Sequence, residues 1–290
     1  MKRRLIFLFV FGILFLGSCS KLPDAGNSNS PGSTGLPDSV TSFKTNNNDQ
    51  IVIDSRYMVN NNEWNIQHTS FPCSEIIFKG NTRGSDYFGW KWSMNNPDQY
   101  TVLTYPEVFC GDTPWAPSAT HPVDFPFTIA GHGLTSSFNI NQTTTTAFGG
   151  NTYDLAYDIW IISNTSNPAS FTSKDIKCEL MIWLASANAI PDGLAPTGSI
   201  TANGYTFNYY YSPTQGGSPH TWTYAAFSAG SGTQIFNAAS FDIAPFLAYL
   251  TNNGVLNPGD YVCTVELGTE VSIGEGITVI SNYSVVVTTK

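Results

Sequence analysis

Two short apolar strings, each with a glutamate set into it, are the parts of this chain best suited to chemistry. They are Cys178-Glu179-Leu180-Met181-Ile182-Trp183-Leu184 and Val265-Glu266-Leu267-Gly268-Thr269-Glu270. A carboxylate is costly to bury among apolar side chains, so one that is found there usually has a function. Glycoside hydrolysis uses two carboxyl groups. One attacks the sugar or activates a water molecule, and the other protonates the leaving oxygen. The two strings therefore favour that chemistry.

The alternation of side chains along a strand assigns these residues to faces. One face of each of three expected strands carries acids, joined on two of the strands by a tryptophan: Glu179, Met181 and Trp183; Glu266, Gly268 and Glu270; and Asp154, Asp158 and Trp160. The opposite faces are apolar and are expected to form the core between two sheets. The three strands should therefore present their acids on a common kind of face.

The elements that must position these acids are short strands. Segments rich in β-branched or aromatic residues and bounded by turn residues predict strands at 50–60, 74–79, 89–94, 152–162, 177–185, 205–211, 221–227, 261–267 and 278–288. One helix is expected where Ile243, Phe246, Leu247 and Leu250 share a helical face, with Ser240 or Asp242 as its cap and Gly254 as its stop. Many strands and one short helix predict an all-β sandwich of two sheets.

The first residues carry signals for export and anchoring. Cationic residues precede an apolar run over 5–16, which is shorter than the roughly 20 residues that span a bilayer. Leu16-Gly17-Ser18-Cys19 resembles a bacterial lipobox, in which the signal is cut before the cysteine and the cysteine is acylated. We expect a signal peptide over 1–18, lipidation at Cys19, a flexible polar linker over 19–48 and one folded domain over 49–290. The expected location is the bacterial cell envelope, anchored to a membrane by lipid.

The composition narrows the possible partners. The formal net charge is −9, and loss of the cationic signal residues makes the chain more acidic, which does not favour nucleic acid or an acidic polysaccharide. Charged residues make up 11%, against roughly 25% in a typical globular domain, while aromatic residues reach 14%. This surface is typical of an exported β protein that binds a neutral polysaccharide. The four histidines, His68, His121, His132 and His220, lack metal-ligand spacing, so neither a metal nor a cofactor is expected.

Several motifs together resemble glycoside hydrolase family 12, the small endoglucanases and xyloglucanases. They occur in family order along the domain: Asn61-Asn62-Glu63-Trp64, Trp90-Lys91-Trp92, Tyr105-Pro106, Tyr157-Asp158, Glu179-Leu180-Met181-Ile182-Trp183-Leu184, Tyr249-Leu250-Thr251-Asn252-Asn253-Gly254 and Gly268-Thr269-Glu270. The resemblance implies a β-jelly-roll sandwich of two antiparallel sheets with one short helix and a concave substrate cleft.

The resemblance also implies residue roles. Glu179 matches the family nucleophile, Glu270 its general acid and base, and Asp158 the carboxyl group that hydrogen-bonds the nucleophile; Asp154 shares the face of Asp158 and competes for that role. Trp64 matches a tryptophan that stacks on a sugar at the glycone end of the cleft. Asn62, Met181 and Trp183 are further expected substrate contacts.

Two departures from the family pattern stand beside these matches. Val271-Ser272 follows Glu270 where the family usually has Pro and an aromatic residue, and Asn65 follows Trp64 where it usually has Gly. The departure after Glu270 affects the local backbone geometry there, and the departure after Trp64 predicts an altered sugar-binding subsite.

Four cysteines remain after lipidation of Cys19, and export makes disulfides possible. Cys178 and Cys263 lie on core-facing positions and can be small buried apolar residues. Of the three possible pairings, we favour a bridge that joins Cys73 and Cys110, both near turn residues.

These observations predict a monomeric, lipid-anchored endo-β-1,4-glucan hydrolase that cuts with retention of configuration. The alternatives are a glycan-binding lipoprotein of the same fold without turnover, and a transglycosylase acting on the same polymers. A binding protein has no need of both Glu179 and Glu270, so their joint presence favours an enzyme. The sequence does not choose among cellulose, mixed-linkage glucan, xyloglucan and xylan.

Overall fold

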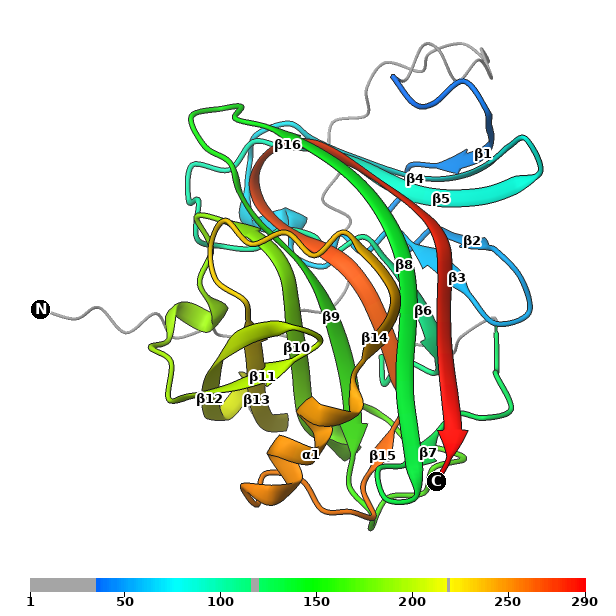
Figure 1. Cartoon of the computed structure of the whole chain (residues 1–290). Coiled ribbons are helices and arrows are strands. Elements are labelled where there is room, and N and C mark those ends of the chain that lie inside the picture. Colours follow the sequence, from blue (N-terminus) through cyan, green and yellow to red (C-terminus); the bar gives the residue numbers. More distant parts are fainter. Residues whose placement is uncertain (1–34, 116–119, 218–219) are drawn as a thin grey trace, which may run out of the picture.

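A computed structural model describes residues 35–115, 120–217 and 220–290, and its regular structure is almost entirely β (Figure 1). The strands are β1 Val40–Lys44, β2 Gln50–Val52, β3 Met58–Asn60, β4 Cys73–Thr82, β5 Ser85–Met94, β6 Glu107–Gly111, β7 Phe127–Thr128, β8 His132–Thr145, β9 Thr152–Ile162, β10 Ile176–Ala187, β11 Gly198–Ala202, β12 Tyr205–Gly217, β13 His220–Ser228, β14 Asn237–Asp242, β15 Tyr261–Val262 and β16 Thr264–Thr289. The helix is α1 Ala244–Asn252, and single 3₁₀ turns are η2 Ile66–His68, η3 Ser173–Asp175 and η4 Pro191–Gly193.

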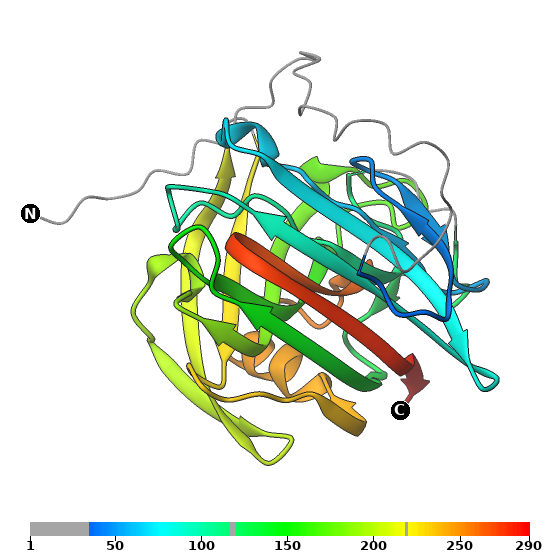
Figure 2. The same cartoon turned by 90° about the horizontal axis from the view of Figure 1, so that it is seen from above.

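The strands form two layers, which Figure 2 shows from above. The layer that carries the acids, here called the acid sheet, has the order β2-β3-β6-β16-β9-β10-β13-β12-β11, and β15 joins β7 to β9. The opposite sheet has the order β1-β4-β5-β16-β8-β14. Neighbours are antiparallel throughout the acid sheet except for β10 and β13, which run parallel. The result is the expected jelly-roll sandwich.

Strand β16 belongs to both layers. Thr264 to Ile273 pair with β6 and β9 in the acid sheet, whereas Gly274 to Thr289 pair with β5 and β8 in the opposite sheet. Figure 1 shows this strand curving from one layer into the other. Gly274 sits at the change of layer with a φ of 117°, a conformation that side-chain-bearing residues rarely adopt. The glycine therefore permits one strand to be shared.

The alternation predicted for the central strands is confirmed. Core-facing side chains of β9 and β10 join one large apolar cluster between the sheets: Tyr157, Ile159, Ile161, Cys178, Leu180, Ile182 and Leu184. Met181 and Trp183, from the other face of β10, belong to a separate small cluster with Ala156, Tyr210, Tyr224 and Ala226. The two faces of the acid sheet are thus distinct, as the sequence indicated.

The expected helix is also confirmed. The expected cap at Ser240 or Asp242 is wrong, because the N-cap is Ile243, which makes no side-chain capping hydrogen bond. The Asp242 carboxylate, one residue earlier, accepts a hydrogen bond from the amide of Ala244 at 3.0 Å. Gly254 follows the helix with a φ of 72°. Phe246 is fully buried, and its ring packs edge-on against Phe207 and Phe227. The helix therefore contributes to the core beside the acid sheet.

The structure differs from the predictions at several places. Residues 40–44, inside the expected linker, form β1 and pair with β4, and Leu36 and Val40 are buried, so the folded domain begins before residue 49. The expected strand over 50–60 is the hairpin of β2 and β3. The predicted Cys73–Cys110 disulfide is wrong, because Cys110 is a buried thiol.

The signal peptide, Cys19 and the first part of the linker lie outside the described residues. Within the described ranges, no helix is long and apolar enough to cross a membrane.

Candidate active site

Six carboxylic acids gather on one face of the acid sheet and are called the acid cluster here: Glu107 on β6, Asp154 and Asp158 on β9, Glu179 on β10, and Glu266 and Glu270 on β16. Their exposure divides them into two groups. Glu107, Asp154, Asp158 and Glu266 are 2 to 7% exposed, whereas Glu179 and Glu270 are only half-buried. The two glutamates that the sequence singled out are therefore the two members that solvent, and hence a substrate, reaches most readily.

Glu179 is held by an indole. Trp222, on the neighbouring strand β13, donates from Nε1 to Oε2 of Glu179 at 2.6 Å. Burial raises the pKa of Glu179 to about 8, and this hydrogen bond opposes that rise because it favours the carboxylate. Trp222 also packs edge-on against Trp160 and Trp115, so the donor is fixed in place. The sequence did not identify Trp222 as a partner of Glu179.

Glu270 is paired with a second acid. In the register of β16 and β9, Glu270 lies directly opposite Asp154, and their carboxyl groups are hydrogen-bonded. Burial raises the pKa of Glu270, and burial together with the charge of Glu270 raises that of Asp154 well above its usual range. The bond favours the charged form of Glu270 and the neutral form of Asp154, so Asp154 is the donor.

Asp158 lies between these groups. It is opposite Glu266 on β16 and opposite Met181 on β10, which places it diagonally from Glu179 on the same face. Burial and the charge of Glu179 raise its pKa well above the usual range, so a neutral acid is favoured. Its Oδ1 has no hydrogen-bond partner among the described residues. The structure thus places Asp158 near Glu179 as a potential donor, and the expected hydrogen bond between them stays a prediction.

Glu107 and Glu266 form the second carboxyl pair, which the sequence did not reveal. Glu107 donates to Glu266, and Glu266 also accepts from Thr264 Oγ1 at 3.0 Å. Burial raises the pKa of Glu266 to about 7 and that of Glu107 well above its usual range. Asn62 donates from Nδ2 to Glu107 Oε1 at 3.4 Å, so this expected substrate contact is linked to the acid cluster.

A tyrosine separates the two carboxyl pairs. Gly268 lies between Glu266 and Glu270 on the acid-bearing face of β16, and a side chain there would come within 2.6 Å of the Tyr105 ring. The Tyr105 hydroxyl donates to the carbonyl of Ala156 at 3.1 Å, on the residue opposite Gly268. A glycine at 268 therefore lets an aromatic ring lie across the strand.

The remaining expected substrate contacts differ in exposure. Trp64 is half-buried in the loop after β3. Met181 and Trp183 are 2 and 3% exposed, and the Tyr224 hydroxyl donates to the Met181 sulfur at 3.3 Å. The buried Nε1 of Trp183 has no hydrogen-bond partner among the described residues. Only Trp64 of these three offers an appreciable surface.

The two departures from the family pattern have a common structural consequence. The Asn65 side chain donates to the Val102 carbonyl at 2.6 Å. The Val271 amide donates to the Thr104 carbonyl at 3.1 Å, a bond that a proline could not make. Both residues thus fasten the segment 102–104, which runs beside the Trp64 loop and precedes Tyr105.

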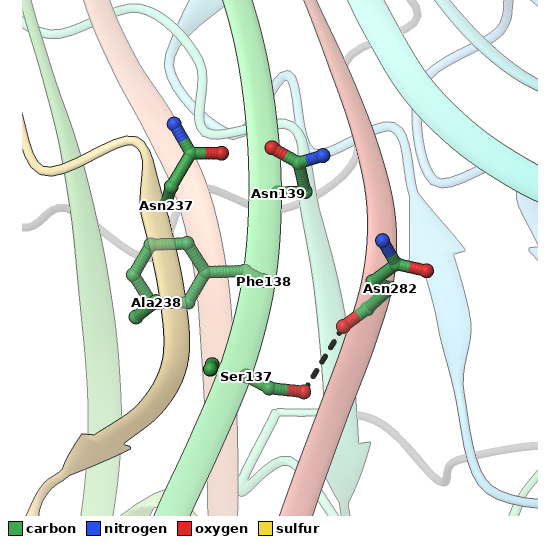
Figure 3. Close-up of a pocket in the computed structure, with 7 residues that line it drawn as sticks. Ser137, Phe138, Asn139, Asn237, Ala238 and Asn282 are labelled. Carbon is green, nitrogen blue, oxygen red and sulfur yellow. Dashed lines mark hydrogen bonds between the residues drawn. The ribbon is translucent and has the colours of Figure 1, made fainter.

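A pocket elsewhere on the molecule has a different character. It lies over β8, β14 and β16 in the opposite sheet, and Figure 3 shows Asn139, Asn237 and Asn282 around it. Ser137 donates to the Asn282 carbonyl at 3.0 Å beside it. None of its lining residues carries a carboxyl group, so it is not suited to acid-base hydrolysis. Within the described part of the chain, no group of three or more His, Cys, Asp or Glu side chains could hold a metal ion.

Comparison with known proteins agrees with this geometry. The model of the protein family described as Glycosyl hydrolase family 12 matches residues 55–288 of this chain. The chain belongs to this family. It is therefore a glycoside hydrolase of the jelly-roll type.

Relatives within the family differ in activity. Endoglucanase S of Pectobacterium parmentieri is 29% identical over 227 residues, which cover 77% of this chain and 78% of that protein. The solved family 12 xyloglucanase of Bacillus licheniformis, in complex with a ligand, is 26% identical with a TM-score of 0.73, covering 85% of this chain and all of that one. A protein of Phytophthora nicotianae named Inactive glycoside hydrolase XLP1 is 28% identical over 46% of this chain and 52% of its own length.

Proposed function

We propose that this family 12 protein is a retaining endo-β-1,4-glucan hydrolase, with Glu179 as nucleophile and Glu270 as general acid and base. The observation that carries the proposal is the exposure pattern of the acid cluster, in which these two glutamates are half-buried and the other four are buried. A retaining mechanism needs two such groups about 5 Å apart across the scissile bond. The charge of Glu270 raises the pKa of Glu179, as expected for two neighbouring groups.

The contacts of each glutamate support its role. The Trp222 indole favours the carboxylate of Glu179, and an ionised group is what attacks the anomeric carbon. The Asp154 contact supplies a proton next to Glu270, which must donate one to the leaving oxygen. Asp158 is favoured as a neutral acid and has an oxygen without a hydrogen-bond partner among the described residues, so it is suited to hold Glu179 in position.

The substrate is proposed to be a neutral β-glucan, bound with Trp64 against a sugar face and Asn62 beside Glu107. Endoglucanase and xyloglucanase names among the relatives support cellulose, mixed-linkage glucan or xyloglucan. Release of reducing ends from these three polymers and from xylan, measured with the purified wild-type protein, tests the substrate class. Proton NMR of the first products distinguishes retention from inversion, and a product of inverted configuration would contradict the double displacement.

Two alternatives remain, and each has its own readout. A glycan-binding protein without turnover, suggested by the inactive relative, would be retained on polymer and release no sugar. A transglycosylase would lengthen labelled acceptor oligosaccharides faster than it releases reducing ends. Glu179→Ala serves as the control in both assays, because it should bind polymer and lose at least about three decades of turnover.

We further propose that a lipid at Cys19 anchors a monomeric protein to the bacterial envelope. The support is the Leu16-Gly17-Ser18-Cys19 string and the polar segment after it. Cys19→Ala should abolish partition into the detergent phase with membranes, while activity of the folded domain persists. Membrane association that survives this substitution would refute the anchor.

A further inference from the structure

Asp154 lies beside Glu270, the proposed general acid and base. It lies opposite Glu270 in the strand register, is 2% exposed, and is hydrogen-bonded to the Glu270 carboxyl group. Its buried Oδ1 has no hydrogen-bond partner among the described residues. Two carboxylates in contact cannot both stay ionised in a buried place, so one proton must lie between them.

We propose that Asp154 and Glu270 act as one unit that shares a single proton, with Asp154 as the positioning residue that supplies it to Glu270. The inference rests on the proposed role of Glu270 as general acid and base. The contact raises the pKa of Asp154 and lowers that of Glu270, which favours a proton on Asp154 that is donated to Glu270. A substrate oxygen placed against the half-buried Glu270 gives that proton an acceptor, so it moves from Asp154 to Glu270 and on to the leaving group.

The proton count closes over the two steps. In the first step the glycosidic bond breaks, Glu270 gives its proton to the leaving oxygen, and Glu179 forms an ester with the anomeric carbon. The unit then holds no proton, but Glu179 has lost its charge, so the three carboxyl groups keep the same net charge. In the second step a water oxygen displaces Glu179 from the anomeric carbon, and its proton returns to the unit.

Other titratable groups face the unit, and their contribution has to be distinguished. They are Tyr105 before β6, Asp158 on β9, Glu179 on β10, Asp192 in η4 and Tyr224 on β13. All of them are acids, and a negative charge on any of them favours the protonated unit. The matched test must therefore change Asp154 alone and leave these groups in place.

The deciding variant is Asp154→Asn, assayed on polymer across pH. Asparagine keeps the size and can donate to Glu270, but it cannot release a proton and carries no charge. Both changes favour the Glu270 carboxylate, so the alkaline limb of kcat/KM should move to lower pH by at least about one unit. Activity at neutral pH on polymer should fall at least about tenfold, with a smaller loss on an aryl glycoside whose leaving group needs no proton.

Controls separate this role from a merely structural one. Glu75→Gln removes another buried carboxyl group, 1% exposed and bonded to Thr104, and should leave the alkaline limb where it is in the wild type. Asp154→Glu retains an ionisable group and should restore part of the shift. An unmoved alkaline limb in Asp154→Asn, with an active wild type, would overturn the proposal. A wild type that hydrolyses no polymer would instead overturn the proposed function.

A second measurement covers the case in which Asp154→Asn does not fold. Carboxyl-carbon NMR of wild-type protein labelled at Asp and Glu should show one aspartate still protonated near neutral pH whose resonance moves together with that of one glutamate. If this coupling is found, the unit exists in the native protein. If every buried aspartate ionises independently at acidic pH, the proposal is refuted.

Discussion

The indole of Trp222 controls how readily Glu179 ionises, and its removal gives a prediction with a definite size. The bond from Nε1 to Oε2 is 2.6 Å and partly buried, and its acceptor is the charged form of Glu179. Hydrogen bonds to charged groups contribute about 1.5 to 3 kcal/mol. Since about 1.4 kcal/mol corresponds to one pKa unit, Trp222→Phe should raise the pKa of Glu179 by roughly one to two units above its value of about 8.

The sign of the effect on activity follows from the proposed role of Glu179 as nucleophile. A nucleophile must be ionised, so a higher pKa moves the acidic limb of kcat/KM to higher pH. On this limb Trp222→Phe should lose roughly ten- to a hundredfold in rate, because each unit is a factor of ten. The assay is reducing-sugar release at subsaturating polymer concentration over the full range of pH at which both proteins stay folded.

Trp90→Phe is the matched control. Trp90 is also buried, and its Nε1 donates at 2.9 Å to the hydroxyl of Thr269, which carries no charge. This variant should be less stable but keep the wild-type acidic limb. If Trp222→Phe loses the same factor at every pH, the indole acts through packing with Trp160 alone and the electrostatic reasoning is refuted.

Three further substitutions test other parts of the structure. Asp260 is fully buried and accepts a hydrogen bond from Lys177 Nζ at 2.6 Å. Asp260→Ala should therefore lower the free energy of unfolding, measured by denaturant titration, by about 3 to 5 kcal/mol. A loss below about 1 kcal/mol would contradict a stabilising ion pair. Burial raises the pKa of Glu266 from 4.5 to about 7, so between these pH values the folded state holds a proton that the unfolded state releases, and stability falls as pH rises. Glu266→Gln should therefore flatten the decline of Tm between pH 5 and 8. An unchanged slope would argue against a protonated Glu266. Trp64→Ala should weaken polymer binding by roughly five- to tenfold and also lower kcat, whereas loss of affinity alone would show that the contact is not used to reach the transition state.

Sequence reasoning succeeded where periodicity and composition agree. The strand over 152–162 was predicted with the same bounds as β9, because the segment is rich in β-branched and aromatic residues and is bounded by turn residues. The face assignments of Glu179 and Glu270 needed only the period of two.

Sequence reasoning missed strands that are rich in polar residues, and it divided a strand at its glycines. Strand β8 is rich in Ser, Thr and Asn, so its pattern resembles a loop. Gly274 and Gly276 separated what is the single strand β16 into two expected ones, although Gly274 is what allows the strand to continue into the other sheet.

The two carboxyl pairs, Asp154 with Glu270 and Glu107 with Glu266, could not be predicted. The pairing of Asp154 with Glu270 depends on the register between β9 and β16, and register is set by long-range contacts that one sequence does not reveal. The same holds for Glu107, which reaches Glu266 only because β6 and β16 are neighbours. A favoured disulfide was wrong for the related reason that nearness to turns says nothing of the distance between two sulfur atoms.

The sharing of β16 between both sheets has a consequence for how the protein acquires activity. This strand follows all the others in synthesis order, and it carries Glu270 together with the pairing partners of β5, β6, β8 and β9. Neither layer can be completed before its arrival, because it supplies a central strand to each. Contacts so distant in sequence form slowly, and until then apolar edges of both layers stay exposed. A chain delivered across a membrane before folding would therefore remain inactive during transit and gain Glu270, its proposed general acid, only in the final stage of assembly.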